Sequence, residues 1–267
     1  MALTHLLILA LIQGVTEFLP ISSSGHLILV PNLTGMADQG QALDVAVHVG
    51  TLLAVVIYFW SDVKGVLQGL GRLFRGRIDT QGAFWALCLI IATIPVVTLG
   101  LALKLTGLSE LLRSTAVIGW TMLIFGLVLY WADQTGPITK HATNWSLRDA
   151  TIMGLWQALA LIPGTSRSGI TITAGRQMGY DRESAARLSM LMSIPTILAS
   201  GVLLSVEVVQ DADMSLVRDA SSAAVFAFLA ALAALKLMFK LLQSVSFTPY
   251  VIYRVLLGVT LLVIAYT

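Results

Sequence analysis

A short polar string inside an apolar stretch decides how this chain folds. Residues 163–169 read PGTSRSG and lie within residues 150–178, which are otherwise largely apolar. A second string, PISSSGH at residues 20–26, interrupts the apolar residues 2–34 in the same way. Because proline and glycine break helices, each stretch predicts a helix-loop-helix hairpin instead of one straight helix.

The composition is that of a polytopic membrane protein. Of the 267 residues, 57% are hydrophobic and 11% are charged, whereas soluble domains carry roughly a quarter charged residues. Polar stretches of no more than about twenty residues leave no room for a soluble domain, so we expect one membrane domain over residues 1–267. The single Cys88 lies in an apolar run, which excludes a disulfide framework and a thiolate metal cluster. The N-terminus lacks the basic region of a signal peptide, so we expect the first segment to belong to the mature fold.

The apolar pattern predicts an all-α fold with six transmembrane helices and two hairpins. Segments long enough to cross about 30 Å of hydrocarbon lie near residues 42–60, 84–105, 115–132, 184–206, 222–243 and 250–267. The hairpins at 2–34 and 150–178 are expected to be re-entrant, entering and leaving on one side. Such backbone survives only where protein or water surrounds it.

Charge in the connections predicts the orientation, because Lys and Arg accumulate on the cytoplasmic side. One set of connections carries twelve basic residues, namely Lys64, Arg72, Arg75, Arg77, Lys140, Arg148, Arg176, Arg182, Arg187, Lys236, Lys240 and Arg254. The other set carries Arg113 and Arg218, together with an acidic 207–220 loop. We therefore expect residues 61–80, 133–149 and 244–250 in the cytoplasm and both termini outside.

Three crossings separate the two hairpins, so the second hairpin must enter from the opposite face. This predicts two inverted repeats, residues 1–132 and 150–267, whose hairpins meet near the membrane centre. Short segments of the two halves show weak sequence similarity, for example GTLLAV at residues 50–55 and PTILAS at residues 195–200.

A carboxylate stands at the end of the first helical arm. On a helix, Gln13 and Glu17 project from one face, directly before the break at Pro20. An ionisable residue inside the membrane is a functional candidate by default. Glu17 is suited to bind a divalent cation or to act as a general base, and the sequence leaves both roles open.

A serine and a histidine follow in the same string. An imidazole beside a hydroxyl activates a serine as a nucleophile or protonates a leaving oxygen. Of the three serines we select Ser23 as the nucleophile, with His26 as its neighbour. Ser22 and Ser24 remain alternatives as nucleophile, phosphate donor or helix cap.

The second string contributes a guanidinium. Arg167 is interpreted as the only basic residue inside a hairpin, and its planar fork suits a phosphate or a carboxylate such as Glu17. Backbone amides around Gly25 and Gly169 are expected to point at the same anion. Asp44 and His48 lie one turn apart and favour an interfacial pair, with a cation ligand or a supporting hydrogen bond as alternatives.

Together these motifs resemble one known family. Gln13 and Glu17, the strings at 20–26 and 163–171, and FTPYVIYR at 247–254 resemble the bacterial undecaprenyl-diphosphate phosphatases, also called bacitracin-resistance proteins, over nearly the whole chain. The resemblance implies hydrolysis of the C55 isoprenoid diphosphate to the monophosphate and phosphate, which recycles the lipid carrier for peptidoglycan synthesis and confers bacitracin resistance. It also implies a divalent cation, Mg²⁺ or Ca²⁺, and a site open to the outer, periplasmic face of the plasma membrane.

By matched position, the resemblance implies catalytic roles for Glu17, Ser23, His26 and Arg167. Gln13 stands where some members have glutamate, which puts in doubt any metal scheme with two carboxylates. The further candidates for binding the substrate phosphates are Gln13, Ser22, Ser24, Gly25, Thr165, Ser166, Ser168, Gly169 and Thr171. The expected partner is a membrane-embedded prenyl diphosphate and not a nucleic acid, and a homodimer is left open. The rival interpretation is a secondary transporter or lipid-carrier flippase, since inverted repeats with broken helices are common in transporters.

Overall fold

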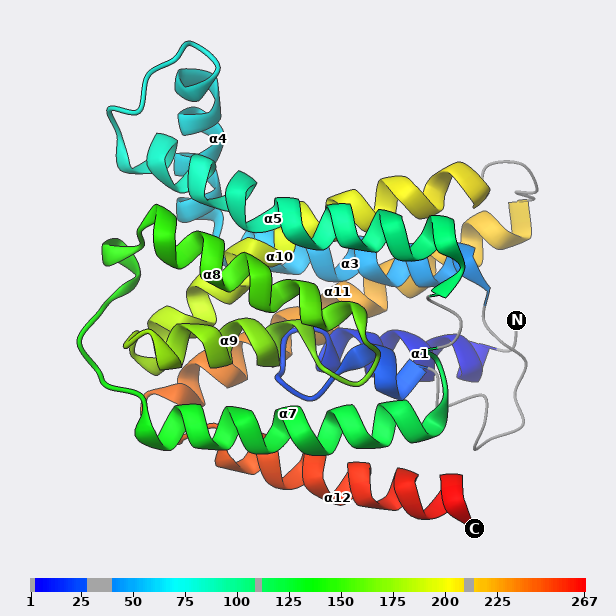
Figure 1. Ribbon diagram of the computed structural model, residues 1–267. Coiled ribbons are helices and arrows are strands. Elements are labelled where there is room, and N and C mark those ends of the chain that lie inside the picture. The colour runs from blue at the N-terminus through cyan, green and yellow to red at the C-terminus, as the bar shows by residue number, and fades with distance from the viewer. Residues whose placement is uncertain (1–2, 28–39, 109–111, 209–213) are drawn as a thin grey trace.

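The fold is a bundle of helices (Figure 1). The structure, a computed structural model, describes residues 3–27, 40–108, 112–208 and 214–267. In these ranges the regular elements are helical apart from an isolated β-bridge between Lys140 and Tyr180, which confirms the predicted all-α class. The α-helices are α1 (Leu3–Thr16), α3 (Gln41–Tyr58), α4 (Trp60–Leu73), α5 (Gln81–Thr106), α7 (Thr115–Thr135), α8 (Leu147–Ala158), α9 (Arg167–Gln177), α10 (Arg182–Val208), α11 (Met214–Leu242) and α12 (Thr248–Tyr266), with short 3₁₀ turns η1 (Ala142–Asn144) and η2 (Leu159–Leu161).

Five of the described helices are long and apolar enough to cross a membrane. They are α5, α7, α10, α11 and α12, and they coincide with five of the six predicted crossing segments. The sixth segment corresponds to α3, which passes the same test only together with α4, bent from it by 92°. The chain is therefore a multi-pass membrane protein. Residues 61–80 were predicted as a plain connection, but most of them form α4, because their apolar residues recur at helical spacing.

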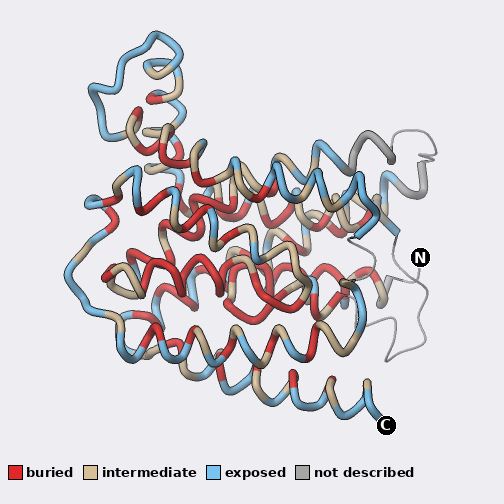
Figure 2. The backbone as a smooth tube through the Cα atoms, viewed as in Figure 1, coloured by how far each residue is buried: buried red, intermediate tan, exposed pale blue. Residues whose placement is uncertain are grey.

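The outer surface of the bundle is apolar. Figure 2 shows exposed residues along the outer faces of α5, α7 and α12, and these faces carry large side chains such as Leu99, Trp131 and Leu256. Water would solvate such a surface poorly, whereas lipid solvates it well. Buried residues, several of them polar, gather along α9 and the facing parts of α1 and α10 (Figure 2).

Two short helices form the second hairpin. α8 and α9 have 12 and 11 residues, or about 18 Å at the usual rise, which is less than the roughly 30 Å of hydrocarbon. The turn between them contacts the first turn, since Ser168 Oγ donates to the Leu19 carbonyl at 2.9 Å. The second arm of the first hairpin falls largely on residues 28–39, outside the described ranges. Re-entry of both hairpins and the boundaries of the two repeats therefore stay predictions.

The connections predicted to be cytoplasmic gather at one end of the bundle, and the ends of α1 and α12 at Leu3 and Tyr266 lie at the other (Figure 1). The charge count behind that prediction needs a correction. Arg176 and Arg254 lie inside helices α9 and α12, and their side chains are only 1% and 0% exposed. Arg176 is thus a second basic residue within a hairpin. The count assigned these residues to loops because it did not anticipate internal partners, such as Asp133 Oδ1 at 3.2 Å from Arg176 Nε.

Candidate active site

The carboxylate of Glu17 accepts hydrogen bonds from both sides of the first turn. Gln13 Nε2 donates to Glu17 Oε2 at 2.8 Å, as their spacing on one helix face predicts. Ser23, on the far side of the turn, donates from Oγ to the same oxygen at 2.8 Å. The chain therefore folds back so that the predicted nucleophile contacts a buried carboxylate directly.

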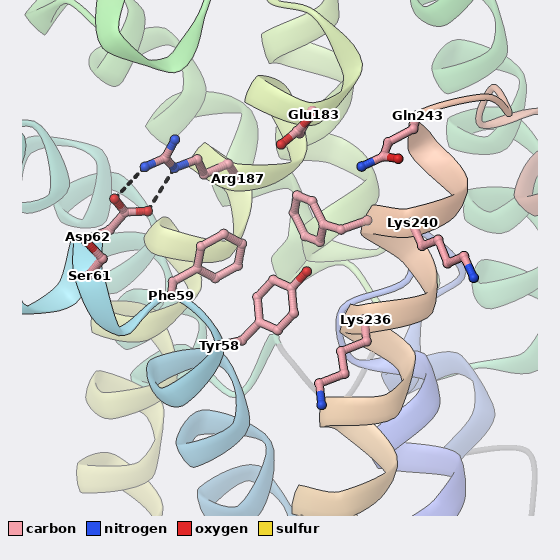
Figure 3. Close-up of a pocket in the computed structure, with 10 residues that line it drawn as sticks. Tyr58, Phe59, Ser61, Asp62, Glu183, Arg187, Lys236, Lys240 and Gln243 are labelled. Atoms are coloured by element: carbon pink, nitrogen blue, oxygen red, sulfur yellow. Dashed lines mark hydrogen bonds and ion pairs between the residues drawn. The ribbon is translucent and has the colours of Figure 1, made fainter.

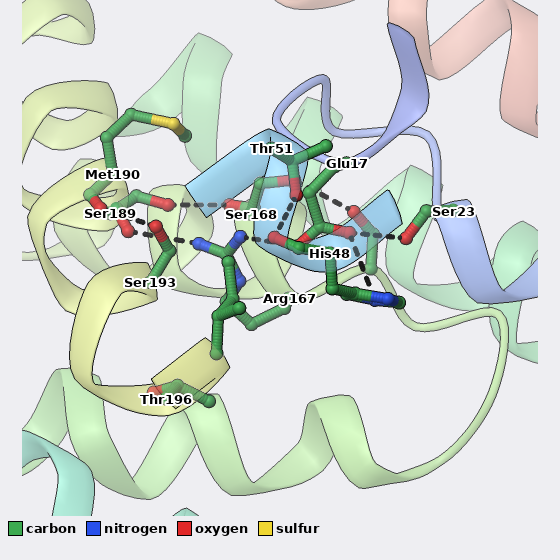
Figure 4. A network of polar contacts seen from close by, with 12 residues as sticks. Glu17, Ser23, His48, Thr51, Arg167, Ser168, Ser189, Met190, Ser193 and Thr196 are labelled. Carbon is green, nitrogen blue, oxygen red and sulfur yellow. Dashed lines mark hydrogen bonds and ion pairs between the residues drawn. The ribbon is translucent and has the colours of Figure 1, made fainter. Parts of the chain in front are cut away.

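The second hairpin brings Arg167 to this carboxylate. Arg167 is the first residue of α9, and its Nη2 lies 3.0 Å from Glu17 Oε1. Its Nη1 donates to the carbonyl of Ser189 on α10 at 3.2 Å. Figure 4 shows the guanidinium lying between Glu17 and Ser189. Glu17, just before the first string, thus meets Arg167 of the second string in an ion pair between residues 150 positions apart.

A cavity of about 230 Å³ lies over the ion pair. Its polar lining residues are Glu17, Ser22, Ser23, Ser24, His48, Ser166, Arg167, Thr196 and Ser200. One guanidinium and several hydroxyl donors around a small space suit an anion with several oxygens, such as a phosphate. Of the residues predicted to bind phosphate, Ser22, Ser24 and Ser166 therefore do line the cavity.

The two turns share an unusual local backbone. Ser22 and Ser166 have positive φ angles of 74° and 71°, which are uncommon for a residue with a side chain. In each turn the serine hydroxyl accepts the amide hydrogen of the glycine three residues later, at 3.3 Å from Gly25 and 3.2 Å from Gly169. These two amides are therefore engaged in capping, which corrects the expectation that they point at a bound anion. Strain of this kind is typical of functional turns.

Three other residues predicted to bind phosphate, Thr165, Ser168 and Thr171, do not line the cavity. Ser168 bonds the first turn through the Leu19 carbonyl, and Thr171 Oγ1 lies 2.6 Å from the hydroxyl of Ser189. Thr165 is fully buried, and its Oγ1 has no hydrogen-bond partner in the described part of the chain. Their hydroxyls face protein because α9 packs against α7 and α10.

His26 faces away from Ser23. Its Nδ1 lies 2.7 Å from the Ser22 carbonyl oxygen, and its Nε2 lies 2.5 Å from the hydroxyl of Tyr253 on α12. The two rings stack with an interplanar angle of 5°. Because both ring nitrogens are engaged, the geometry does not support His26 as the base for Ser23, and Glu17 occupies that position.

His48 joins the site from α3. Its Nε2 lies 3.9 Å from Glu17 Oε2, and its Nδ1 lies 2.7 Å from the Asp44 carbonyl oxygen. The ring lies beside Glu17 at the edge of the cavity (Figure 4), which fits the alternative of a supporting contact better than an interfacial pair with Asp44. Its spacing from Asp44 showed only that both lie on one face of α3, and the packing of α3 against α1 decides where that face points.

Arg254 on α12 forms hydrogen bonds to both turns. It was not predicted as a site residue. Its Nη1 donates to the Pro20 carbonyl at 3.3 Å, and its Nη2 donates to the carbonyls of Gly164 and Thr165 at 3.1 and 2.9 Å. Its Nε donates to the Met122 carbonyl on α7 at 3.3 Å. A single buried guanidinium thus bonds one turn from each hairpin.

An apolar groove of about 330 Å³ adjoins the cavity between α5 and α10. The two spaces share the lining residues Val96, Leu161, Thr196 and Ser200, and the groove continues past Gly100 and Ala199. A polar chamber next to an apolar groove on the lipid side suits an amphiphile whose charged head is small and whose tail is long.

The Glu17 carboxylate offers a hard cation an oxygen ligand at the cavity. Gln13 Oε1 is buried and has no hydrogen-bond partner among the described residues. Within those residues no group of three His, Cys, Asp or Glu side chains could hold a metal by itself. Mg²⁺ commonly binds through one or two carboxylates together with substrate phosphates, so the remaining ligands would come from a bound diphosphate.

Comparison with known sequences gives the family. The chain matches the family model of the bacitracin resistance protein BacA over residues 6–260. The chain belongs to the BacA family. Among curated members, the protein named undecaprenyl-diphosphatase from Dinoroseobacter shibae is 71% identical over 267 residues, with 100% of both chains covered. The BacA-family proteins of the same name from Jannaschia sp. and Chromohalobacter salexigens are 70% and 46% identical, with 100% and 97% of each chain covered. These matches confirm the family resemblance that the two polar strings indicated.

Proposed function

We propose that this BacA-family chain is an undecaprenyl-diphosphatase, which hydrolyses undecaprenyl diphosphate to undecaprenyl phosphate and inorganic phosphate. The observation that carries the proposal is the Glu17–Arg167 ion pair, which joins both hairpins under a serine-lined cavity. In the cell this reaction returns the lipid carrier to peptidoglycan synthesis and gives resistance to bacitracin. The charge pattern of the connections favours an orientation with both termini toward the periplasm, and the family resemblance implies the inner membrane and a substrate entrance on that face.

In the proposed reaction, Arg167 and the serine hydroxyls bind the terminal phosphoryl group. Ser23 Oγ attacks the phosphorus of that group, and the serine proton passes to the Glu17 carboxylate, whose Oε2 lies 2.8 Å from Ser23 Oγ. The bond between this phosphorus and the bridging oxygen breaks, which releases undecaprenyl phosphate. Water then attacks the phosphoserine, so that phosphate leaves and Ser23 regains a proton. Phosphoryl transfer depends mainly on positioning and on stabilisation of the charge, and the ion pair is placed to supply both.

A divalent cation, Mg²⁺ or Ca²⁺, belongs to the same proposal. Glu17, which lines the cavity, would hold it together with diphosphate oxygens, and when bound it would neutralise charge on the diphosphate. We expect chelation to abolish turnover and either ion to restore it. Full turnover in the presence of excess chelator would contradict this part of the proposal.

The prenyl tail is assigned to the groove between α5 and α10. The groove adjoins the cavity and is lined by residues such as Val97, Gly100 and Leu203. About 25 cal/mol is gained for each Å² of apolar surface removed from water. A tail that moves from lipid into an apolar groove leaves one apolar environment for another, so it gains little of this free energy. The groove therefore directs the tail more than it adds to affinity.

The function is tested with the purified protein in detergent and undecaprenyl diphosphate as substrate. We expect phosphate release, and a loss of at least about 100-fold in Glu17→Gln and in Arg167→Met. Glu183→Gln and Arg148→Met, at exposed positions away from the cavity, are the matched controls and should stay near the wild-type rate. Unchanged turnover in both site variants would reject this site.

Two further measurements separate the alternatives. Rapid quenching followed by peptide mapping should find phosphate on Ser23, and a Ser23→Ala variant with near-normal turnover would instead favour direct attack by water. A flippase moves its substrate without releasing phosphate. Net phosphate release in detergent, where no gradient exists, therefore distinguishes hydrolysis from transport.

A further inference from the structure

Helix α4 projects from one end of the bundle at a steep angle to the spanning helices (Figure 1). It follows α3 at an angle of 92°, and Figure 1 shows α4 and the start of α5 projecting from one corner of the bundle. Close glycine contacts fix this hairpin, since a Cβ on Gly69 would lie 2.2 Å from the carbonyl carbon of Gly82. Because α3 runs along the bundle with the spanning helices, α4 is held roughly in the plane of the membrane surface.

One face of α4 is an apolar stripe. It consists of Val63, Val66, Leu67, Leu70 and, just after the helix, Phe74, which recur at the three- and four-residue spacing of a helix face. The first four line an apolar groove of about 170 Å³ between α4, α5 and α10. Leu67 and Phe74 are 55% and 85% exposed, so the stripe extends beyond the protein's own core.

The other side of the hairpin is basic. Lys64, Arg75 and Arg77 are exposed and form no ion pair in the part of the chain that the structure describes. The acid on this hairpin's loop, Asp79, is already paired with Arg72 at 2.5 Å. Helices with an apolar stripe opposite Lys and Arg bind at the interface of a bilayer, with the apolar side toward the acyl chains.

A pocket at the base of α4 extends the basic surface. It has a volume of about 420 Å³, and Figure 3 shows Lys236 and Lys240 on α11 across from the Asp62–Arg187 ion pair. Glu183 offsets one of these lysines, so the pocket remains net positive. The pocket and the α4 hairpin lie at the same end of the bundle, where lipid headgroups would meet the protein.

We infer that α4 is an interfacial helix that binds an anionic phospholipid. The acyl chain lies in the groove under the apolar stripe, and the anionic headgroup lies over the basic side of the hairpin, which carries Lys64, Arg75 and Arg77. Basic clusters at a membrane surface attract anionic headgroups, and the apolar groove gives one chain of that lipid a defined place. The inference does not depend on the proposed hydrolysis.

The depth of α4 is tested with nitroxide labels in nanodiscs of phosphatidylglycerol and phosphatidylcholine. Cys88→Ala removes the single native cysteine, and its helix content by circular dichroism checks that the background folds. Labels at Leu67→Cys and Phe74→Cys should collide mainly with oxygen, whereas labels at Lys64→Cys and Gln68→Cys should collide mainly with a water-soluble nickel chelate. Equal nickel access at all four positions would overturn the inference.

The choice of lipid is tested by native mass spectrometry from the same nanodiscs. The triple variant K64Q/R75Q/R77Q should retain at least about tenfold less phosphatidylglycerol than the wild type, with phosphatidylcholine unchanged. The control K104Q/R113Q/R218Q removes the same charge at the opposite end of the bundle and should retain the lipid. Equal loss in both triple variants, or no loss in either, would overturn the proposed site, and inorganic phosphate added in excess should not displace the lipid.

Discussion

Replacing Arg254 by methionine tests whether one buried guanidinium joins the two hairpins. In the wild type it donates to carbonyls of Pro20, Gly164, Thr165 and Met122, and also to Thr121 at 3.4 Å. Methionine fills similar space without a donor, so five buried carbonyls lose a hydrogen bond. At about 1 kcal/mol each the loss is about 5 kcal/mol, and relief from burying a charge lowers the net to about 3 kcal/mol.

For a protein of this size, a loss of about 3 kcal/mol corresponds to a fall in Tm of roughly 6–12 °C. Thermal unfolding of Arg254→Met in detergent measures this change. Phosphate release should fall as well, because the Glu17–Arg167 pair spans the two turns that Arg254 joins. Arg148→Met, at an exposed position, is the control for loss of one basic residue. An Arg254→Met variant with wild-type Tm and wild-type turnover would refute the reasoning.

Three further outcomes are expected. Gly169→Ala should reduce phosphate release far more than Gly25→Ala. A new Cβ at Gly169 would lie 2.8 Å from Arg254 Nη1, whereas a new Cβ at Gly25 would lie no closer than 3.4 Å to its nearest neighbours. Equal rates of phosphate release in the two variants would contradict this prediction. Ala199→Trp, which fills the groove beside the cavity, should lower kcat/KM for undecaprenyl diphosphate about tenfold more than for a short prenyl diphosphate, and a uniform loss would argue against the groove as the tail site. Burial raises the pKa of Asp181, but hydrogen bonds from Ser184 and His141 outweigh it and hold the pKa below its usual 3.8. The stability from this shift is present above pH 3.8 and is lost as the pH falls through the lower pKa of the folded state, so Asp181→Asn should flatten the acid limb of Tm against pH, and an unchanged slope would count against it.

The helical class and the positions of the spanning helices could be predicted from sequence because lipid imposes a simple length rule. Apolar runs of about twenty residues must be helices if every backbone polar group is to be satisfied in hydrocarbon. Local contacts were predictable for a similar reason, since Gln13 and Glu17 lie four residues apart on one helix. The helix α4 was overlooked, because its stripe of Val63, Val66, Leu67 and Leu70 is interrupted by polar residues and lies next to a charged loop.

The sequence by itself determined that this is a membrane protein with two polar breaks, and that Glu17, Ser23 and Arg167 are the chemical groups placed there. Only the tertiary structure decided which neighbours those groups meet. In the folded chain, His26 contacts Tyr253, His48 lies near Glu17, and Arg254 forms hydrogen bonds to both turns. The physical reason is that spacing along a helix fixes which residues share a face, whereas the element that this face contacts depends on how all the helices pack together.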